Sequence, residues 1–170
     1  HVDGHQPDAA LYYAKECRAR GIPTSLDGGA VRENTQELLQ YIDIAVVSEQ
    51  MCEQMGFSPA EMLAHLQSHG CRVGGVTMGE RGLLWYAPGH EIQNLPALPV
   101  PPEKVIDTNG AGDIFHGSYL YSCLTWPDRG WDAHFRFARA ASAFAIQRLG
   151  NEASLPSVQD VLETEKSFEG

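Results

Sequence analysis

Two spacings of hydrophobic residues alternate along this chain. Apolar residues three or four positions apart indicate amphipathic helices, whereas short runs rich in Val and Ile between turn residues indicate buried strands. The predicted helices are residues 7–20, 34–41, 58–70, 113–124, 131–148 and 157–166, with a further short helix ending at Met55. The predicted strands are residues 22–26, 44–47, 73–77, 83–86 and 91–95, and residues 1–3 resemble the end of another. This alternation favours an α/β fold with a mainly parallel sheet.

Turn and capping residues mark several of these boundaries. Ser58-Pro59-Ala60-Glu61 is typical of a helix start, and Asn34 with Glu37 resembles a capping box. Pro88-Gly89 predicts a tight turn between two antiparallel strands. Residues 96–102 contain four prolines and predict an extended connector between structured segments.

Composition narrows the function classes. The chain has 170 residues, of which 43% are hydrophobic, and 12 basic against 22 acidic residues give a formal net charge of −10. We therefore expect a globular domain that binds neither nucleic acid nor membrane. The four cysteines are scattered without a C-x-x-C pair, which favours reduced thiols in a cytoplasmic protein. His65 and His69 share a helical spacing, and we interpret them as a solvated helix end rather than a metal site.

The segment Asp107-Thr108-Asn109-Gly110-Ala111-Gly112-Asp113 carries the clearest chemistry. It follows the apolar residues Val105 and Ile106 and precedes a predicted helix. Small residues at a strand-to-helix junction present backbone N–H groups to an anion, and the helix dipole adds to the attraction. A carboxylate at that point, Asp113, suits a base that takes a proton from an attacking hydroxyl. The alternatives are a plain strand-to-helix turn and a helix N-cap at Asp113.

Two other glycine motifs do not match this segment. A dinucleotide-binding G-x-G-x-x-G motif would need a third glycine where Phe115 stands, and a P-loop needs a Gly-Lys pair that the sequence lacks. The segment instead closely resembles the D-T-x-G-A-G-D motif of the ribokinase (PfkB) family of ATP-dependent carbohydrate kinases. That resemblance covers essentially the whole chain but only the C-terminal part of a typical family member.

The resemblance implies a ribokinase-like three-layer α/β/α fold. Residues 1–170 would form the C-terminal portion of one kinase domain, with the nucleotide-binding and catalytic parts present and the N-terminal part and β-lid absent. In the family the last Asp of the motif is the general base, and this position is Asp113 here. The N–H groups of Gly110, Ala111 and Gly112 would then stabilise negative charge on the transferring phosphoryl group.

A second cluster resembles the nucleotide segment of the family. Thr77, Gly79 and Gly82 match the fixed positions of its T-x-G-x-x-G pattern, although a hairpin that needs turn glycines would show the same pattern. Ser48 and Met51 replace the Asn and the acidic residue of the family's N-x-x-E motif, which puts its water-mediated magnesium network in doubt. Arg139 stands where an Asn often lies near the adenine, so it either contacts the nucleotide or faces solvent.

Other implied roles concern a cation and a histidine. Some family members bind a monovalent cation such as K⁺ beside the anion loop, mainly through backbone carbonyls. The corresponding positions here are Asp107, Asn109, Ala145, Arg148, Gly150 and Ser154. His116 lies one helical turn after Asp113, where Asn is common in the family, and we expect it to pack or to hydrogen-bond a substrate rather than to take a second catalytic role.

The expected activity is transfer of the γ-phosphoryl group of ATP, with Mg²⁺ bound mainly by the nucleotide, to a sugar hydroxyl. Ser48-Glu49 is similar to the ketohexokinase and sulfofructose kinase branch, which suggests a ketose-like acceptor. Alternatives are a nucleoside or vitamin-precursor kinase of the same fold and a non-catalytic nucleotide- or sugar-binding regulator. We expect a homodimer when the lid is present, and little or no activity from residues 1–170 alone.

Overall fold

The computed structural model describes residues 1–169, which form two compact units. Unit 1 comprises His1–Gly79 and Leu83–Leu95, and unit 2 comprises Glu80–Gly82 and the residues from Pro96 onward. In the part of the chain that the structure describes, none of the helices has the length and hydropathy needed to cross a membrane.

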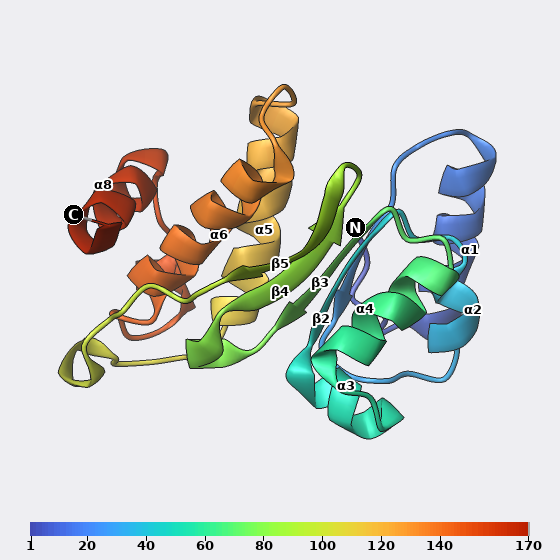
Figure 1. The fold of residues 1–170 in the computed structure, drawn as a ribbon, viewed down its shortest axis with the longest axis horizontal. Helices are drawn as coiled ribbons and strands as arrows, with labels where there is room; N and C mark the ends of the chain where they lie inside the picture. The colour runs from blue at the N-terminus through green and yellow to red at the C-terminus, as the bar shows by residue number, and fades with distance from the viewer. Residues whose placement is uncertain (170) are drawn as a thin grey trace. The chain divides into compact units, whose positions relative to one another are not determined.

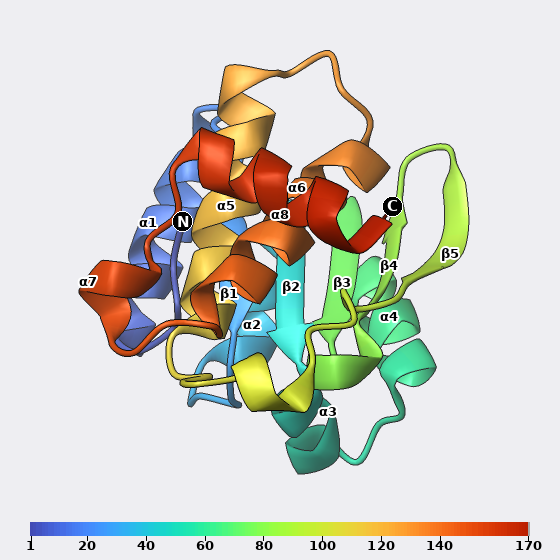
Figure 2. The same cartoon turned by 90° about the vertical axis from the view of Figure 1, so that its left-hand side faces the viewer.

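A five-stranded mixed sheet forms the centre of unit 1. Its strands are β1 (Ser25–Gly28), β2 (Ile44–Ser48), β3 (Val73–Thr77), β4 (Leu83–Ala87) and β5 (His90–Leu95), and they lie in this order across the sheet (Figure 2). The first three strands are parallel, whereas β4 and β5 are antiparallel to their neighbours. The sheet is therefore parallel on one side and closes with a hairpin on the other. Near the N-terminus, Val2 makes a single parallel bridge to Leu26 of β1.

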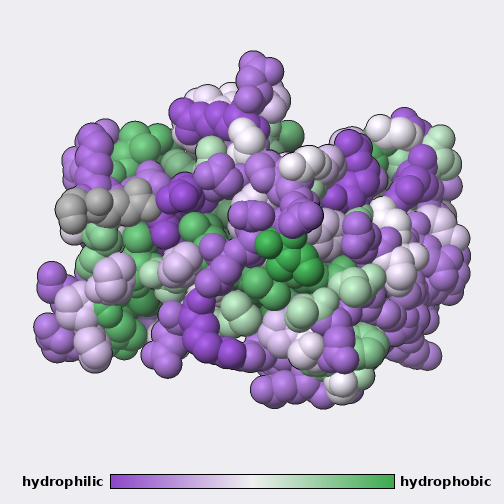
Figure 3. All heavy atoms as spheres, in the orientation of Figure 1, coloured by the Kyte–Doolittle hydropathy of each residue, from purple (hydrophilic) through white to green (hydrophobic). Residues whose placement is uncertain are grey.

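Four helices cover one face of this sheet (Figure 1). They are α1 (Pro7–Ala19), α2 (Thr35–Leu39), α3 (Glu49–Met55) and α4 (Pro59–Ser68). Their inner residues form a core with the sheet that includes the fully buried Leu39, Val47 and Met62. Hydrophilic residues predominate on the outer side of these helices in the view of Figure 3, as an amphipathic helix on a sheet requires.

One predicted capping box forms and the other does not. Ser58 accepts a hydrogen bond from the backbone N–H of Glu61, whose side chain accepts one from the N–H of Ser58. The prediction at Asn34 was wrong, because its side chain makes no capping bond and instead donates to Asp8. Glu37 binds Lys15 at 2.7 Å. Both side chains of that expected box are thus engaged with α1.

Strand β1 begins three residues later than predicted. Gly21 adopts a positive φ of 67°, and the N–H of Ile22 donates to the carbonyl of Cys17, so both residues end helix α1. Ile22 is 49% exposed and does not extend the sheet. The strand continues through Asp27 and Gly28, beyond the predicted end at residue 26.

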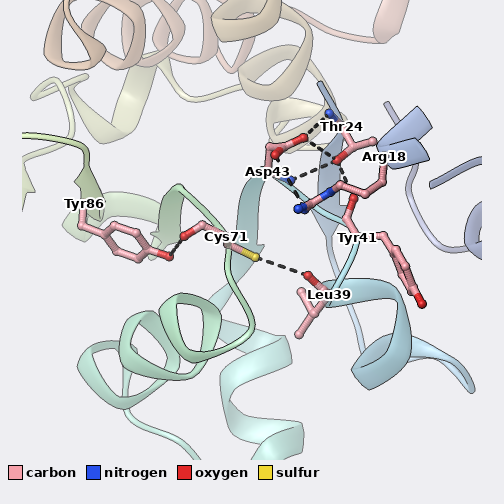
Figure 4. Close-up of polar contacts among 7 residues, drawn as sticks. All are labelled: Arg18, Thr24, Leu39, Tyr41, Asp43, Cys71 and Tyr86. Carbon is pink, nitrogen blue, oxygen red and sulfur yellow. Dashed lines mark hydrogen bonds and ion pairs between the residues drawn. The ribbon is translucent and has the colours of Figure 1, made fainter. Parts of the chain in front are cut away.

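Thr24 and Asp43 link the turns that precede β1 and β2 (Figure 4). One Asp43 oxygen accepts hydrogen bonds from the N–H and hydroxyl of Thr24, at 2.9 and 3.0 Å. The Thr24 hydroxyl also lies 2.7 Å from the carbonyl of Tyr41, and it accepts from the N–H of Asp43. Arg18 lies 3.6 Å from the other Asp43 oxygen. These bonds fix the start of the two strands relative to each other.

Tyr86 and Cys71 form a second buried contact in the same view (Figure 4). The Tyr86 hydroxyl donates to the carbonyl of Cys71 at 2.9 Å, and the Cys71 thiol donates to the carbonyl of Leu39 at 3.7 Å. The Tyr86 ring fits because Gly74 opposite it has no side chain, and a Cβ there would lie 2.3 Å from the ring. Burial raises the pKa of the Cys71 thiol to about 12. All four cysteines are free thiols in this structure; Cys52 and Cys71 are buried, and Cys17 and Cys123 are partly exposed.

Helices make up most of unit 2. They are α5 (Ala111–Thr125), α6 (Trp131–Ala145), the short α7 (Asn151–Ser154) and α8 (Val158–Glu169), and α6 contacts both α5 and α8 (Figures 1 and 2). Phe135 of α6 stacks on Phe115 of α5, with ring centroids 6.1 Å apart. The buried Ser122 hydroxyl lies 2.8 Å from Nδ1 of His134, which joins the same two helices by a polar contact.

The motif was expected at a strand-to-helix junction, and the strand part of this prediction was wrong. Val105 and Ile106 are 38% and 60% exposed and belong to no strand in the described structure. The N–H groups of Ile106 and Asp107 both donate to the carbonyl of Ile146, just after α6. The loop at residues 107–110 is therefore anchored to the end of a helix rather than to a sheet. The helix α7 and the short 3-10 turns Gly79–Arg81 and Pro102–Lys104 were not predicted.

Candidate active site

Helix α5 begins at Gly110 and places Asp113 in its first turn. Gly110 is the N-cap, with φ 74° and ψ 0°, and its carbonyl accepts the first helical hydrogen bond from the N–H of Ile114. The capping position is thus occupied by a residue without a side chain, which excludes the N-cap interpretation of Asp113. Within residues 1–169 the exposed Asp113 carboxylate has no hydrogen-bond partner. It is available to contact a ligand.

The start of α5 also leaves backbone donors available. The N–H of Ala111 donates to the carbonyl of Thr108 at 3.3 Å. Among the described residues, the N–H groups of Gly110, Gly112 and Asp113 have no acceptor. Unpaired donors at a helix N-terminus attract anions. The structure thus shows Ala111 engaged and adds the N–H of Asp113 to the donors expected from the sequence.

Gly110 is required for two reasons. Its positive φ is a conformation that residues with a Cβ rarely adopt. A Cβ at this position would also lie 2.9 Å from Oδ1 of Asn151 and 3.8 Å from Oδ2 of Asp113. Both side chains therefore face the space above Gly110.

Asp107 joins the loop at residues 107–110 to the segment after α6. One carboxylate oxygen accepts a hydrogen bond from the N–H of Asn109 at 2.9 Å, and the other accepts from the N–H of Gly150 at 3.1 Å. These backbone bonds lower the pKa of Asp107 below its usual range. The structure thus brings together three of the residues expected near a cation: Asp107, Asn109 and Gly150.

The other residues of the expected cation set lie nearby in the sequence but have partners of their own. The N–H of Arg148 donates to the carbonyl of Ala145 at 3.0 Å. Its guanidinium donates to the carbonyl of Phe144 and lies over that ring. The buried Ser154 hydroxyl donates to the carbonyl of Asn151 at 3.0 Å. A cation here would need carbonyl oxygens that can accept more than one bond, which carbonyls can do.

A pocket of about 530 Å³ opens beside Asp113 within unit 2. Its walls come from one face of α5, from α6, and from α7, α8 and the segment that joins them. The residues that line it are Gly110, Asp113, Ile114, Gly117, Ser118, Tyr121, Phe137, Asn151, Leu155, Pro156, Ser157, Val158 and Val161. This volume is in the range of small-molecule sites.

In unit 1, Ser48 and Thr77 are register partners at the carboxyl ends of β2 and β3. The Ser48 hydroxyl caps helix α3 by accepting from the N–H of Met51, and it donates to the carbonyl of Gly29 at 2.7 Å. Its position is therefore explained by local structure. The Thr77 hydroxyl donates to the carbonyl of Val47 at a longer 3.3 Å.

Gly79 is the first residue of the short 3-10 turn after Thr77, and Gly82 directly follows that turn. Both have positive φ values, 57° and 91°. The glycines of the T-x-G-x-x-G pattern thus serve the turn itself, which agrees with either interpretation of that pattern.

Arg139 and His116 have structural partners. Arg139 is half-buried and donates to the carbonyl of Pro96 at 3.2 Å, so it holds the proline-rich connector against α6. His116 is buried, with Nδ1 3.4 Å from the Tyr119 hydroxyl, and burial lowers its pKa to about 4. The interpretation of His116 as a packed residue accounts for this geometry.

The expected absence of a metal role for His65 and His69 is compatible with their packing. Their rings lie 4.3 Å apart beside Phe57, and burial together with the charge of His69 lowers the pKa of His65. In the described residues, no group of three or more His, Cys, Asp or Glu side chains is arranged to hold a metal ion.

The sequence interpretation missed Asn151. It follows Gly150 in the predicted cation segment, but only the fold shows that its side chain lies over Gly110. A polar residue directly after a loop glycine is a weak signal, and the sequence offered no stronger one.

Comparisons with known proteins agree on one family. The model of the pfkB family of carbohydrate kinases matches residues 9–158. A ribokinase of Lactococcus lactis subsp. lactis is 26% identical over 165 residues, covering 97% of this chain and 52% of that protein. A 2-dehydro-3-deoxygluconokinase of Escherichia coli K12 is 32% identical over 127 residues, covering 68% of this chain and 41% of that protein.

A solved structure shows the same fold. The ribokinase of Arabidopsis thaliana, complexed with ribose and ATP, superposes with a TM-score of 0.81 at 25% identity, covering 93% of this chain and 52% of that one. This chain thus spans about half the length of the curated relatives it matches. The fold is ribokinase-like α/β, and the chain belongs to the pfkB family of carbohydrate kinases.

Proposed function

We propose that residues 1–170 are the C-terminal portion of an ATP-dependent sugar kinase domain and carry its catalytic base. The observation that supports this most directly is the position of Asp113. Its carboxylate is exposed and without a protein partner among the described residues, beside the unpaired N–H groups of Gly110 and Gly112. An acceptor for a proton and a set of donors for a phosphoryl group are two of the elements that phosphoryl transfer uses.

The proposed reaction begins with a sugar hydroxyl near Asp113. The hydroxyl oxygen attacks the γ-phosphorus of ATP, its proton passes to the Asp113 carboxylate, and the bond between the γ-phosphorus and the bridging oxygen breaks to release ADP. The N–H groups at the start of α5 stabilise the negative charge on the transferring oxygens. Ala111 contributes its N–H only if its long bond to Thr108 is released.

For the nucleotide we propose Thr77, Gly79 and Gly82, with Ser48 and Arg139 as further contacts. The glycine turn allows close approach of a phosphate to the backbone. Mg²⁺ bound with ATP would neutralise negative charge on the phosphate groups. Ser48 and Arg139 would have to keep their present bonds to Gly29 and Pro96 or exchange them for the ligand.

A K⁺ ion is proposed beside Asp107. Each Asp107 oxygen accepts one N–H, which leaves lone pairs on both oxygens, and the partly exposed carboxylate supplies the negative charge. Asn109 and Gly150 are held close to this carboxylate by their own hydrogen bonds to Asp107. Ala145, Arg148 and Ser154 would complete the set of K⁺ ligands with backbone or hydroxyl oxygens. The donor set fits a hard, singly charged cation.

For the acceptor we propose a ketose or a related sugar with a carbonyl at carbon 2. Ser48-Glu49 supports it by its similarity to the ketohexokinase and sulfofructose kinase branch. The Escherichia coli relative supports it as well, because its name denotes a sugar acid oxidised at carbon 2. A pentose is the competing acceptor, since several relatives are ribokinases.

The test is ATP consumption by the full-length polypeptide that carries these residues, against ketoses, aldopentoses, 2-keto sugar acids and nucleosides. We expect turnover on one sugar class and a loss of about 10²- to 10⁴-fold in kcat for Asp113→Asn, because a general base contributes roughly that factor. Asp128→Asn is the matched control, an exposed carboxylate in the loop after α5. Turnover of a nucleoside would identify a nucleoside kinase instead of a sugar kinase. Unchanged activity of Asp113→Asn would show that Asp113 is not the catalytic base.

Two further proposals concern the activity of residues 1–170 alone and the oligomeric state of the full-length kinase. Residues 1–170 alone should show little or no kinase activity, and ADP release at the rate of a full-length relative would contradict this. The full-length kinase is proposed to be a homodimer, which light scattering would test.

A further inference from the structure

Asn151 and Asp113 face the same small space. Oδ1 of Asn151 lies 2.9 Å, and Oδ2 of Asp113 lies 3.8 Å, from the point where a side chain at position 110 would begin. The two oxygens are therefore no farther apart than the sum of these distances. Because Gly110 has no side chain, this space is left for a group from outside the chain. Both residues also line the pocket beside α5.

The backbone of Asn151 is held firmly. The preceding N–H, that of Gly150, donates to Asp107, and the carbonyl of Gly150 accepts from the N–H of Ser154. The carbonyl of Asn151 itself accepts from the Ser154 hydroxyl. In contrast, the Asn151 side-chain amide makes no hydrogen bond to the described residues. Asn151 is exposed, so its amide is free to bind a ligand while its backbone is held in place.

The chemistry of an amide suits a hydroxylated ligand. Asn offers one acceptor oxygen and two donor hydrogens, so it can bind either a hydroxyl or a carbonyl oxygen. It is neutral, so it adds no charge repulsion toward Asp113 or toward a phosphate. A group bound to Asn151 would lie within a few ångströms of the Asp113 carboxylate.

We propose that Asn151 contacts the acceptor sugar and positions it for Asp113, by binding the oxygen on the carbon next to the reacting hydroxyl. This inference rests on the proposed function, in which Asp113 is the base. The acceptor class that follows is a sugar with two neighbouring oxygen groups, one that is phosphorylated and one that Asn151 holds. Asn151 is thus a specificity-determining residue.

The test compares the full-length wild type with Asn151→Ala on two acceptors, the sugar that is turned over and its analogue without the neighbouring oxygen. We expect Asn151→Ala to lower kcat/KM for the sugar by about 10-fold, roughly the contribution of one hydrogen bond, and to leave KM for ATP unchanged. The deoxy analogue should be a poorer substrate of the wild type by a similar factor. It should lose nothing further in the variant, because the partner of Asn151 is already absent.

Glu152→Ala is the matched control, since Glu152 is the next residue of α7, exposed and without a partner among the described residues. Equal losses on both acceptors would indicate that Asn151 only supports the loop, and unchanged kinetics would exclude any role; either result overturns the inference. In both cases wild-type turnover with loss in Asp113→Asn leaves the proposed function intact. If the full-length wild type turned over no sugar, both the proposed function and this inference would be rejected.

Discussion

The carboxylate of Asp107 accepts a hydrogen bond from the backbone N–H of Gly150, 43 positions later in the sequence, at 3.1 Å. The same carboxylate accepts from Asn109 two residues away. One side chain thus closes both the turn that precedes Gly110 and the segment that carries Asn151. The arrangement of the Asp113 and Asn151 side chains above Gly110 depends on this link through Asp107.

Asp107→Asn should destabilise unit 2 in a pH-dependent way. An amide keeps one acceptor oxygen, but its NH₂ group opposes the N–H of the other partner. Backbone hydrogen bonds from Asn109 and then Gly150 lower the pKa of Asp107 in the folded state, so their stabilisation is present above the usual Asp pKa of about 4 and is lost as the pH falls through the lowered value. Thermal unfolding should show the variant below the wild type at pH 7, with the gap closing in acid. A gap that is constant with pH would show that the charge is irrelevant.

Gly110→Ala and Gly112→Ala should differ in sign. At position 110 the positive φ costs roughly 1–2 kcal/mol for a residue with a Cβ, and the contact with Asn151 adds to it. This corresponds to a decrease of several degrees in melting temperature for a chain of this size, at about 2–4 °C per kcal/mol. Gly112 lies inside the helix, and a Cβ there would meet no other heavy atom within 4 Å, so alanine should raise helix stability slightly. Circular dichroism melts of both variants test this, and equal effects would contradict the geometry.

Much of the fold could be predicted from local sequence. The apolar runs placed β2 and β3 to within one residue, and Ser58 with Glu61 marked the start of α4, because these signals act over a few residues. Strand β1 was misplaced because Gly21 and Ile22 terminate α1, and that competition between two elements is not visible in an apolar pattern.

In the candidate site too, only the features set by local sequence could be predicted. The motif identified Asp113 and Gly110 because their spacing is a local property of the helix start. Val105 and Ile106 were misassigned because an apolar pair can be exposed when its N–H groups bind a distant carbonyl, here that of Ile146. The position of Asn151 depends on a bond to Asp107 across 43 residues, so no local pattern could have given it.

Thr24→Val should destabilise unit 1. The Thr24 hydroxyl is buried and joins Asp43 to the carbonyl of Tyr41. Valine would leave both of these groups without the hydrogen bond that the hydroxyl makes to them. Leaving a buried polar group unpaired costs about 1–3 kcal/mol. Thr125→Val, at an exposed position near the end of α5, is the matched control and should change stability by less than about 0.5 kcal/mol. Urea unfolding of the two variants would measure the difference, and equal midpoints would show that the Thr24 link contributes little.

His116→Asn should reduce the acid sensitivity of the fold. Burial lowers the pKa of His116 from 6.5 to about 4, so the unfolded chain takes up this proton more readily than the folded one between these values. The stability is therefore complete above about pH 6.5 and falls as the pH decreases toward 4, by up to about 3 kcal/mol. Asn does not titrate in this range and removes that dependence, although the variant also loses packing at all pH values. The measurement is the free energy of unfolding of wild type and variant between pH 4 and 8, with exposed His5→Gln as control. Parallel curves for wild type and His116→Asn would show that His116 is accessible to protons in the folded state.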